Sequence, residues 1–206
     1  MLSIVIPTDD GKNALFQKSL QDFENHTEVE ILPVSFLEAS SRAERLNIGF
    51  HKSKGEVVLF HHPRTYLPRE AINYLIELSC QKEQKVRWGG FLHQFDKEHF
   101  LLRFISWYSN FIRFKRKGIV YLDHCVFFDR RLWQSDLKLQ YIFEDTELSQ
   151  KFRKITWPVL LPYPAITSAH RFEKNGIIKQ SLLNQLLKLG YFLRLPSSIL
   201  FSLYQR

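Results

Sequence analysis

The stretch that decides the fold is Gly55–Pro68, GEVVLFHHPRTYLP, in which an apolar run ends abruptly in polar residues before a proline. Val57–Phe60 is β-branched and aromatic and too short for a helix, so it predicts a central strand that is buried on both faces. The polar residues after it then lie in a loop at the carboxyl edge of a sheet, where α/β folds place their chemistry. Residues 69–80 predict a helix with Pro68 in its first turn.

The rest of the chain alternates between strand and helix signals, which is typical of βα units. Pro33 indicates an edge strand or a strand end, because proline cannot donate a hydrogen bond to a ladder. The sequence predicts strands at residues 2–7, 29–34, 86–95, 119–129 and, as short pieces broken by prolines, 157–166; further helices are expected at 13–23, 40–50, 98–117 and 142–153.

Two expected helical segments combine apolar and basic residues. Residues 98–117 are rich in aromatic residues and end in a basic turn, which suits the helix dipole. The aromatic stripe fits either a membrane-contacting face or a core face, and the sequence favours the core. Residues 176–206 predict a basic amphipathic helix packed on a main domain of residues 1–175; its apolar face comprises Ile177, Ile178, Leu182, Leu183, Leu186, Leu187 and Leu189.

The charge of the chain is concentrated at its C-terminal end. The 206 residues are 45% hydrophobic and 24% charged, which allows a proper core in one domain, and the net charge is +8. Residues 151–206 hold nine Lys and Arg but a single acid, Glu173, so they account for the whole excess. Such a tail suits a polyanion, an anionic membrane or a phosphorylated substrate, and equally a plain solvated surface. No nucleic-acid-binding motif accompanies it, so we expect no nucleic-acid partner.

Cysteine usage and hydropathy bear on the compartment. Cys80 and Cys125 are far apart and lie in apolar settings, which favours a reducing compartment over a disulfide framework. Neither a signal peptide nor an apolar segment of roughly 18 to 20 residues is visible. We therefore expect a cytoplasmic protein, with the inner face of the membrane as the alternative if residues 176–206 contact lipid.

The order of these pieces resembles the family 2 glycosyltransferases of the GT-A fold, and most closely a short bacterial subgroup, from about Ser41 through Tyr191. The resemblance implies a Rossmann-like α/β fold with a mixed, mostly parallel central sheet flanked by helices. The matching pieces are SIVIPT, SRAERLNIGF, GEVVLFHHPRTYLP, WGGFLHQFD, GIVYLDHCVFFDRRLW, FEDTELSQKFRK and SAHRFEKNGIIKQSLLNQLL.

The resemblance implies transfer of a sugar from a nucleotide-sugar donor to an acceptor hydroxyl, on a saccharide, a lipid-linked molecule or a protein. An inverting transfer needs a carboxylate that deprotonates the acceptor and a countercharge for the leaving diphosphate. Asp145, in the pair Glu144–Asp145, matches the family's general base. The alternative is that two acids in a first helical turn complement the helix dipole.

The resemblance also implies a set of binding positions. Each has a plainer alternative, such as a strand end, a β-bulge, a turn or a solvated loop. The positions are Pro7, Thr8 and Arg42 around the base and phosphates, Gly89 and Gly90 for a backbone contact with donor or acceptor, Asp123 in the acceptor pocket, and His170 and Arg171 in a loop over the diphosphate.

Two departures from the family pattern concern the donor site. Relatives bind Mn²⁺ or Mg²⁺ through an aspartate in a His-small-Asp-Thr loop, whereas this chain has His62, Pro63, Arg64 and Thr65, and a cation cannot ligate a cation. The chain is also shorter before Arg42, where Glu38 is the nearby acid that could replace a base-binding aspartate. Either Arg64 and Arg171 neutralise the diphosphate without metal, or the chain is a degenerate, non-catalytic homologue that binds a partner.

Overall fold

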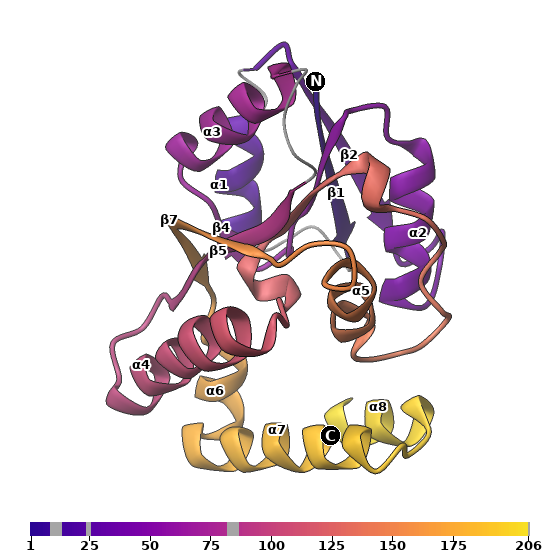
Figure 1. Ribbon diagram of the computed structural model, residues 1–206. Coiled ribbons are helices and arrows are strands. Elements are labelled where there is room, and N and C mark those ends of the chain that lie inside the picture. Colours follow the sequence, from indigo (N-terminus) through magenta and orange to yellow (C-terminus); the bar gives the residue numbers. More distant parts are fainter. Residues whose placement is uncertain (9–13, 24–25, 82–86, 206) are drawn as a thin grey trace.

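The computed structural model describes residues 1–8, 14–23, 26–81 and 87–205 of the chain (Figure 1). Within these residues seven strands form one sheet in the order β2-β1-β3-β6-β5-β7-β4. The β1, β2 and β3 strands are parallel, β6 is antiparallel to both of its neighbours, and β5 and β7 are parallel. The strands are β1 (Leu2–Thr8), β2 (Val29–Ser35), β3 (Val57–Phe60), β4 (Thr65–Tyr66), β5 (Trp88–Phe95), β6 (Val126–Asp129) and β7 (Val159–Thr167).

Helices cover both faces of this sheet. On one face, a core built around Phe23, Ile72 and Leu75 joins α1 and α3 to the strands. On the other face, Leu46, Phe114 and Leu148 bring in α2, η1 and α5. The helices are α1 (Ala14–Phe23), α2 (Arg42–Lys52), α3 (Arg69–Cys80), α4 (Phe100–Trp107), α5 (Glu144–Phe152), α6 (His170–Asn175), α7 (Ile177–Phe192) and α8 (Ser197–Gln205), with a π-helix η1 (Tyr108–Arg116) and 3-10 turns η2 (Leu122–His124) and η3 (Arg130–Leu132).

The organising stretch forms the predicted unit of strand, loop and helix. All four residues of β3 are buried between β1 and β6, which confirms the central strand. The residue that begins this unit, Gly55, must be glycine, because a Cβ there would lie 2.7 Å from the backbone nitrogen of Ser3, closer than real Cβ contacts allow. Pro68 immediately precedes α3 as its N-cap instead of lying inside the first turn.

The N-terminal strands also follow the sequence pattern. The β1 strand is fully buried, and β2 pairs with β1 alone, with Pro33 opposite Ile6. The edge position expected from Pro33 is therefore confirmed. The expected helix at residues 13–23 begins at Ala14 in the structure, and Asn13 lies outside the described residues.

The prediction of a single α-helix over residues 98–117 is wrong. The α4 helix ends at Trp107, and residues 108–116 continue as a π-helix. Within this wider helix, the Asn110 side chain accepts a hydrogen bond from the backbone N–H of His93 at 2.9 Å and donates one to its carbonyl at 3.0 Å. These two hydrogen bonds to β5 explain why the helix widens at η1, because they fix Asn110 against a distant strand. Such π-helical turns are frequent at functional sites.

The predicted strand at residues 119–129 is shorter in the structure. Only residues 126–129 form β6, and Asp123 lies in the preceding turn η2, not at a strand start. Cys125 joins the two with φ of 51°, a left-handed conformation that a regular strand excludes.

The prolines of residues 157–166 do not break the chain into short strands. A single strand, β7, contains Pro162 and Pro164 because its register with β5 shifts after Leu161, so that Leu92 pairs with Pro164. Because of this irregularity, Pro162 has no paired residue in β5. The β5 strand begins at Trp88, and Val86, which we expected at its start, lies outside the described residues.

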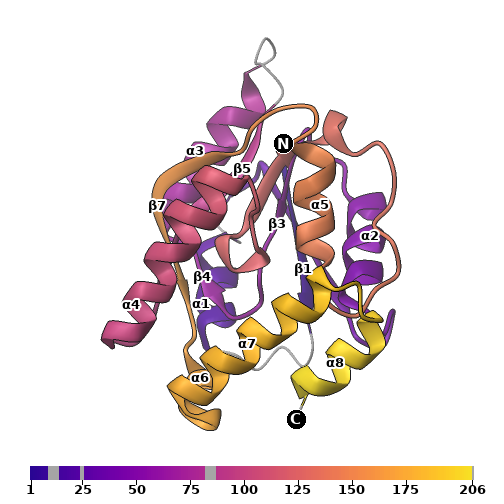
Figure 2. The ribbon, with the colours of Figure 1, turned by 60° about the horizontal axis from the view of Figure 1, so that its bottom comes forward.

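The C-terminal segment forms two helices instead of one. The α7 helix ends at Phe192, and Arg194, with φ of 60°, turns the chain before Pro196 into α8. Leu187 and Leu200 are buried against Ile142 and Phe143, just before α5. The two helices therefore pack at the end of the sheet where α5 begins (Figure 2). No described helix has the length and hydropathy needed to cross a membrane.

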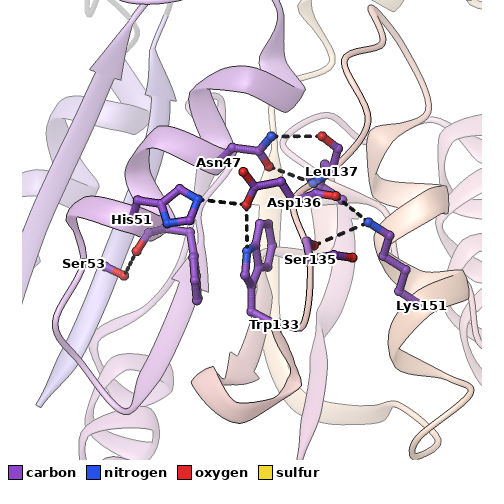
Figure 3. A network of polar contacts seen from close by, with 9 residues as sticks. Asn47, His51, Ser53, Trp133, Ser135, Asp136, Leu137 and Lys151 are labelled. Atoms are coloured by element: carbon purple, nitrogen blue, oxygen red, sulfur yellow. Dashed lines mark hydrogen bonds and ion pairs between the residues drawn. The ribbon is translucent and has the colours of Figure 1, made fainter.

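A polar network fastens the connection between β6 and α5 to α2 (Figure 3). The Asn47 amide donates to the Leu137 carbonyl and accepts from the Leu137 N–H, both at 2.9 Å. Asp136 accepts from Trp133 Nε1 at 3.2 Å and lies 2.8 Å from His51 Nε2. The network therefore holds the connection that leads into α5 against the second half of α2.

Candidate active site

The start of α2 and the start of α5 meet in an ion pair between Arg42 and Glu144. The Ser41 hydroxyl caps α2 by accepting from the Glu44 N–H at 3.1 Å, which fixes where the helix begins. Glu144 is completely buried, and its Oε2 has no hydrogen-bond partner among the described residues. Desolvation opposes the charge on Arg42, but the fields of Glu144 and Asp145 outweigh it and raise the pKa of the guanidinium.

Asp145 lies next to this pair and is buried. Its Oδ2 accepts a hydrogen bond from the backbone N–H of Leu122 at 3.2 Å, which ties α5 to η2. Burial and the negative charge of Glu144 raise the pKa of Asp145 to about 7, although Arg42 acts in the opposite direction. A carboxylate with a pKa near the working pH is well suited to accept a proton as a general base.

Backbone strain lies on both sides of these residues. Phe143, directly before Glu144, adopts a left-handed conformation with φ of 68°, and Cys125 follows η2 with φ of 51°. Each such conformation costs on the order of 1 kcal/mol for a residue that is not glycine. The packing of Phe143 against Tyr191, with ring centroids 4.6 Å apart, holds the strained turn in place.

A second group forms where β3, η2 and β7 end. His62 Nδ1 accepts from the Arg64 N–H at 3.1 Å, and its Nε2 lies 3.6 Å from Asp123 Oδ1. Thr167 Oγ1 bonds Thr65 Oγ1 at 2.7 Å and donates to the Asp123 carbonyl at 3.3 Å, which joins the three segments.

The Asp123 carboxylate is the acidic group of this second cluster that a ligand can reach. Its side chain is 43% exposed. Desolvation works to raise the pKa of Asp123, but the fields of His62, His93 and Arg42 are stronger together and lower it. Asp123 is therefore ionised at neutral pH and contributes to the raised pKa of Asp145.

The loop of Arg64 lies beside the segment that contains His170 and Arg171. Ser168 donates its backbone N–H to the Arg64 carbonyl at 3.0 Å, which extends the pairing of β4 with β7. His170 is exposed at the start of α6. The guanidinium of Arg171 lies 3.8 Å from the ring centroid of Tyr204, a residue of α8. The backbone segments of the two arginines therefore lie next to each other.

The other predicted residues at the ends of β1 and β2 have partners of their own. Pro7 and Thr8 end β1, where the Thr8 carbonyl accepts from Arg45 Nη1 at 2.7 Å. Glu38 lies in the turn between β2 and α2, where it accepts from the Ser35 N–H and pairs with Lys52 at 2.5 Å. These contacts give Glu38 a role in the turn, and the base-binding role that the resemblance implied stays a prediction.

Gly89 and Gly90 are buried inside β5 and allow a close approach within the protein. A Cβ on Gly89 would lie 1.9 Å from the Val159 carbonyl oxygen, and one on Gly90 would lie 3.0 Å from His124. Both positions therefore require glycine for packing inside the protein. The backbone contact with a donor or acceptor that the resemblance implied stays a prediction.

Sequence reasoning missed three residues next to the site. Arg45 follows Arg42 by three residues, so it shares a helix face with it, and this spacing could have identified it. Burial raises the pKa of Tyr121 to about 12, and its ring lies 4.1 Å from the Arg113 guanidinium. Tyr204 reaches Arg171 only because α8 folds back, which no local pattern predicts.

The residues present do not fit a divalent metal. Across the described ranges, no group of three His, Cys, Asp or Glu side chains is arranged to hold a cation. Arg64 occupies the loop after β3 where the resemblance implied a metal-binding aspartate. Mg²⁺ and Mn²⁺ prefer several oxygen ligands, and Asp123 beside a histidine and an arginine does not supply them.

The strand order and the helices on both faces define the class: the fold is that of the GT-A glycosyltransferases. No protein-family model and no curated protein sequence matches the chain.

Similar solved structures include S. aureus TarS 1–349, with a TM-score of 0.62 and 13% identity over 81% of this chain and 60% of that chain. The same protein in complex with UDP-GlcNAc gives a TM-score of 0.61 at 13% identity over 81% and 58%. Mannosyl-3-phosphoglycerate synthase from Rubrobacter xylanophilus gives 0.55 at 10% identity over 92% and 74%. The chain thus spans about 60% of the TarS 1–349 length that it resembles.

Proposed function

We propose that this chain is a glycosyltransferase that moves a sugar from a nucleotide-sugar donor to an acceptor hydroxyl with inversion. The observation that carries the proposal is Asp145, a buried carboxyl group whose pKa is raised to about 7 at the carboxyl edge of a GT-A sheet. A neighbour with the same fold was solved in complex with UDP-GlcNAc, which supports a nucleotide-sugar donor.

In this proposal Asp145 acts as the general base. It removes the proton from the acceptor hydroxyl while that oxygen attacks the anomeric carbon, and the bond to the diphosphate breaks on the opposite face. The Leu122 N–H holds the Asp145 carboxylate in position during the step. Glu144 is neutralised by Arg42 and tunes the pKa of Asp145 instead of receiving the proton itself.

The leaving diphosphate requires positive charge, and the chain offers arginine in place of a metal site. Arg64 and Arg171 come from adjacent segments, and a guanidinium binds phosphate oxygens in a bidentate manner. For Arg171 this role means that the phosphate competes with the ring of Tyr204 for the guanidinium.

A binding panel of nucleotide sugars, run once with Mn²⁺ and once with a chelator, tests this function. We expect one donor to bind equally well in both conditions. Arg64→Asp should weaken that donor at least about tenfold, since a lost charge-assisted bond costs about 1.5 kcal/mol or more. Arg69→Asp, an exposed arginine on α3, is the matched control. Binding that requires metal would refute the arginine role.

A second candidate is a non-catalytic homologue that binds a ligand or partner. The ion pair of Arg42 with buried Glu144 favours it, because this arginine is already engaged and is not available to a phosphate. The two candidates differ in turnover. Release of nucleoside diphosphate from a bound donor, lost in Asp145→Asn, supports the enzyme; binding without turnover in the wild type supports the homologue.

A further inference from the structure

The helical run α4–η1 presents a row of exposed aromatic side chains, which we call the aromatic row. The sequence favoured burial of this stripe, and the structure contradicts it: Phe104 is 58% and Trp107 48% exposed. The rings touch one another, with centroids 5.8 Å apart between Phe104 and Trp107 and 6.4 Å between Trp107 and Phe111. The row consists of Phe100, Phe104, Trp107 and Phe111.

The α7 helix presents a second apolar row, which we call the aliphatic row. Only one side of α7 is used for packing, through Leu187 and the half-buried Leu183. Leu186, by contrast, is 64% exposed. The spacing of four, four, three and four residues places the row on one helix face. It consists of Ile178, Leu182, Leu186, Leu189 and Leu193.

The two helices run side by side. Ile177, at the start of α7, packs against the cluster of Leu102 and Phe172, and so lies next to α4. Eleven residues further along α7, Lys188 lies within the field of Arg113 and Lys117 of the η1 end. Figures 1 and 2 show α4 and α7 on the same side of the molecule, with the short α6, which leads from β7 into α7, at one end of the pair.

Both rows lie within segments that contain basic residues and no acids. Residues 99–122 hold five Lys and Arg, residues 174–206 hold another five, and neither segment includes Asp or Glu. Burial and the repulsion of Arg113 and Lys117 lower the pKa of Lys188 to about 7, which shows how closely the cations gather. Exposed cations around the rows are Arg103, Lys115, Arg116, Lys174 and Lys179.

We propose that α4–η1 and α7 together form a docking surface for an anionic phospholipid membrane. Aromatic side chains are favoured at the level of the lipid headgroups, and exposed lysines and arginines are attracted to anionic lipid. A second copy of this chain is the poorer occupant, because it would bring a like-charged surface against this one. The inference is independent of sugar transfer, and it places the protein flat on the membrane, held by helices that lie in its interface.

Flotation of the full chain with two kinds of vesicle tests the inference. We expect the protein to float with vesicles of phosphatidylcholine and phosphatidylglycerol, to remain unbound with phosphatidylcholine alone, and to dissociate at high salt. Tryptophan emission should shift to the blue on binding, and Trp107→Phe should remove much of this shift while keeping flotation. Absence of flotation with the anionic vesicles would overturn the proposal.

Charge reversal provides the sharpest variant, because the residues are exposed and their replacement leaves the core intact. Each basic residue near an anionic surface adds about fivefold to partitioning, so Lys115→Glu with Arg116→Glu should weaken binding about 25-fold or more. Arg69→Glu with Arg87→Glu is the matched control, since both are exposed and lie outside the two helices. Equal losses in the two pairs would show a general charge effect and contradict a docking surface.

Removal of the rings tests the apolar contribution. Phe104→Ser with Trp107→Ser should reduce flotation on the order of tenfold, while the circular dichroism spectrum and the melting temperature stay close to those of the wild type. If this variant does not fold, Leu182→Gln with Leu186→Gln replaces it. A concentration-dependent dimer that these changes abolish, together with unchanged flotation, would assign the surface to a second copy instead.

Discussion

Two buried polar clusters lie within the same fold, and they differ in how completely their groups are paired. Around the start of α5, Glu144 Oε2 has no partner among the described residues, and the pKa of Asp145 is raised to about 7. Between β5 and η1, His124 donates from Nδ1 to the Phe91 carbonyl at 2.9 Å and accepts from Ser109 Oγ at 2.8 Å. His93 Nδ1 bonds Ser106 Oγ at 3.1 Å.

The contrast distinguishes a structural cluster from a chemical one. Burial lowers the pKa of His93 to about 4 and that of His124 to about 3, so both rings are neutral and their hydrogen bonds serve packing. Asp145 instead keeps a proton that it can exchange near neutral pH. An acid with a raised pKa, next to a carboxylate with an unpaired oxygen and a strained turn, is therefore a better marker of a candidate site than the number of titratable groups gathered in one place.

The largest expected effect is that of Asp145→Asn on turnover. Loss of a general base should lower the rate of nucleoside diphosphate release on the order of a thousandfold, while donor binding is retained. Glu147→Gln is the matched control on the same helix, because Glu147 pairs with Lys151 and lies away from Leu122. A comparable loss in both variants would show that α5 had been disturbed and would remove the assignment of Asp145.

The histidine cluster should respond in stability instead of turnover. His124→Ala leaves the Phe91 carbonyl and Ser109 without partners and creates a cavity, so we expect the free energy of unfolding to fall by about 3 kcal/mol. Urea titration measures this loss. His51→Ala should change it by less than about 0.5 kcal/mol, because His51 is exposed beside Asp136. Equal costs would contradict a structural role for the buried histidine.

The two clusters should give opposite pH dependences of stability. Asp145 binds its proton more tightly in the folded state, so its contribution is present at pH 4 and is lost as the pH rises through about 7, on the order of 3 kcal/mol. The neutral histidines are instead destabilising below about pH 6.5, where the unfolded chain gains protons that the folded state excludes. Asp145→Asn should remove only the alkaline loss, as unfolding curves at pH 5 and pH 8 would show. Parallel curves for variant and wild type would contradict the raised pKa.

The smallest expected effect separates a single bond from the whole cluster. Ser106→Ala removes the hydroxyl that bonds His93 Nδ1 and should cost about 1 kcal/mol in the free energy of unfolding. Ser181→Ala is a control on α7, where the hydroxyl bonds only the Ile177 carbonyl of the preceding turn. A cost near that of His124→Ala would mean that the cluster acts as one cooperative network.

Local patterns were sufficient to predict those strands and helices whose residue types alone favour a buried strand, an edge strand or a helix start. A short β-branched and aromatic run such as Val57–Phe60 favours a buried central strand, and Pro33 favours an edge strand or a strand end. The acidic start of α5 was predicted as a helix start for the same local reason. The pattern gave no sign of the π-helix, because the Asn110 contact with His93 joins residues 17 positions apart.

The candidate site divides in the same way. The sequence singled out Asp145, Arg42, Arg64 and Arg171 through a resemblance of ordered motifs, and spacing alone left Asp145 as a residue that complements a dipole. The structure added what sets the pKa of Asp145: burial and the neighbouring Glu144 raise it, and the Leu122 N–H lowers it. It also gave Gly89 and Gly90 a packing reason, since only the tertiary structure shows which atoms a side chain at these positions would meet.

The sequence by itself determined the alternation of the main strands and helices, the excess of positive charge at the C-terminal end and the arginine in the loop after β3. These properties depend on residue type and short-range periodicity, both of which are visible in the sequence. Only the tertiary structure decided the protonation of Asp145 and the exposure of the aromatic row, because a pKa and an exposed area depend on which distant segments come to lie alongside. The same aromatic stripe would be core in one packing and surface in another, and its sequence is identical in both.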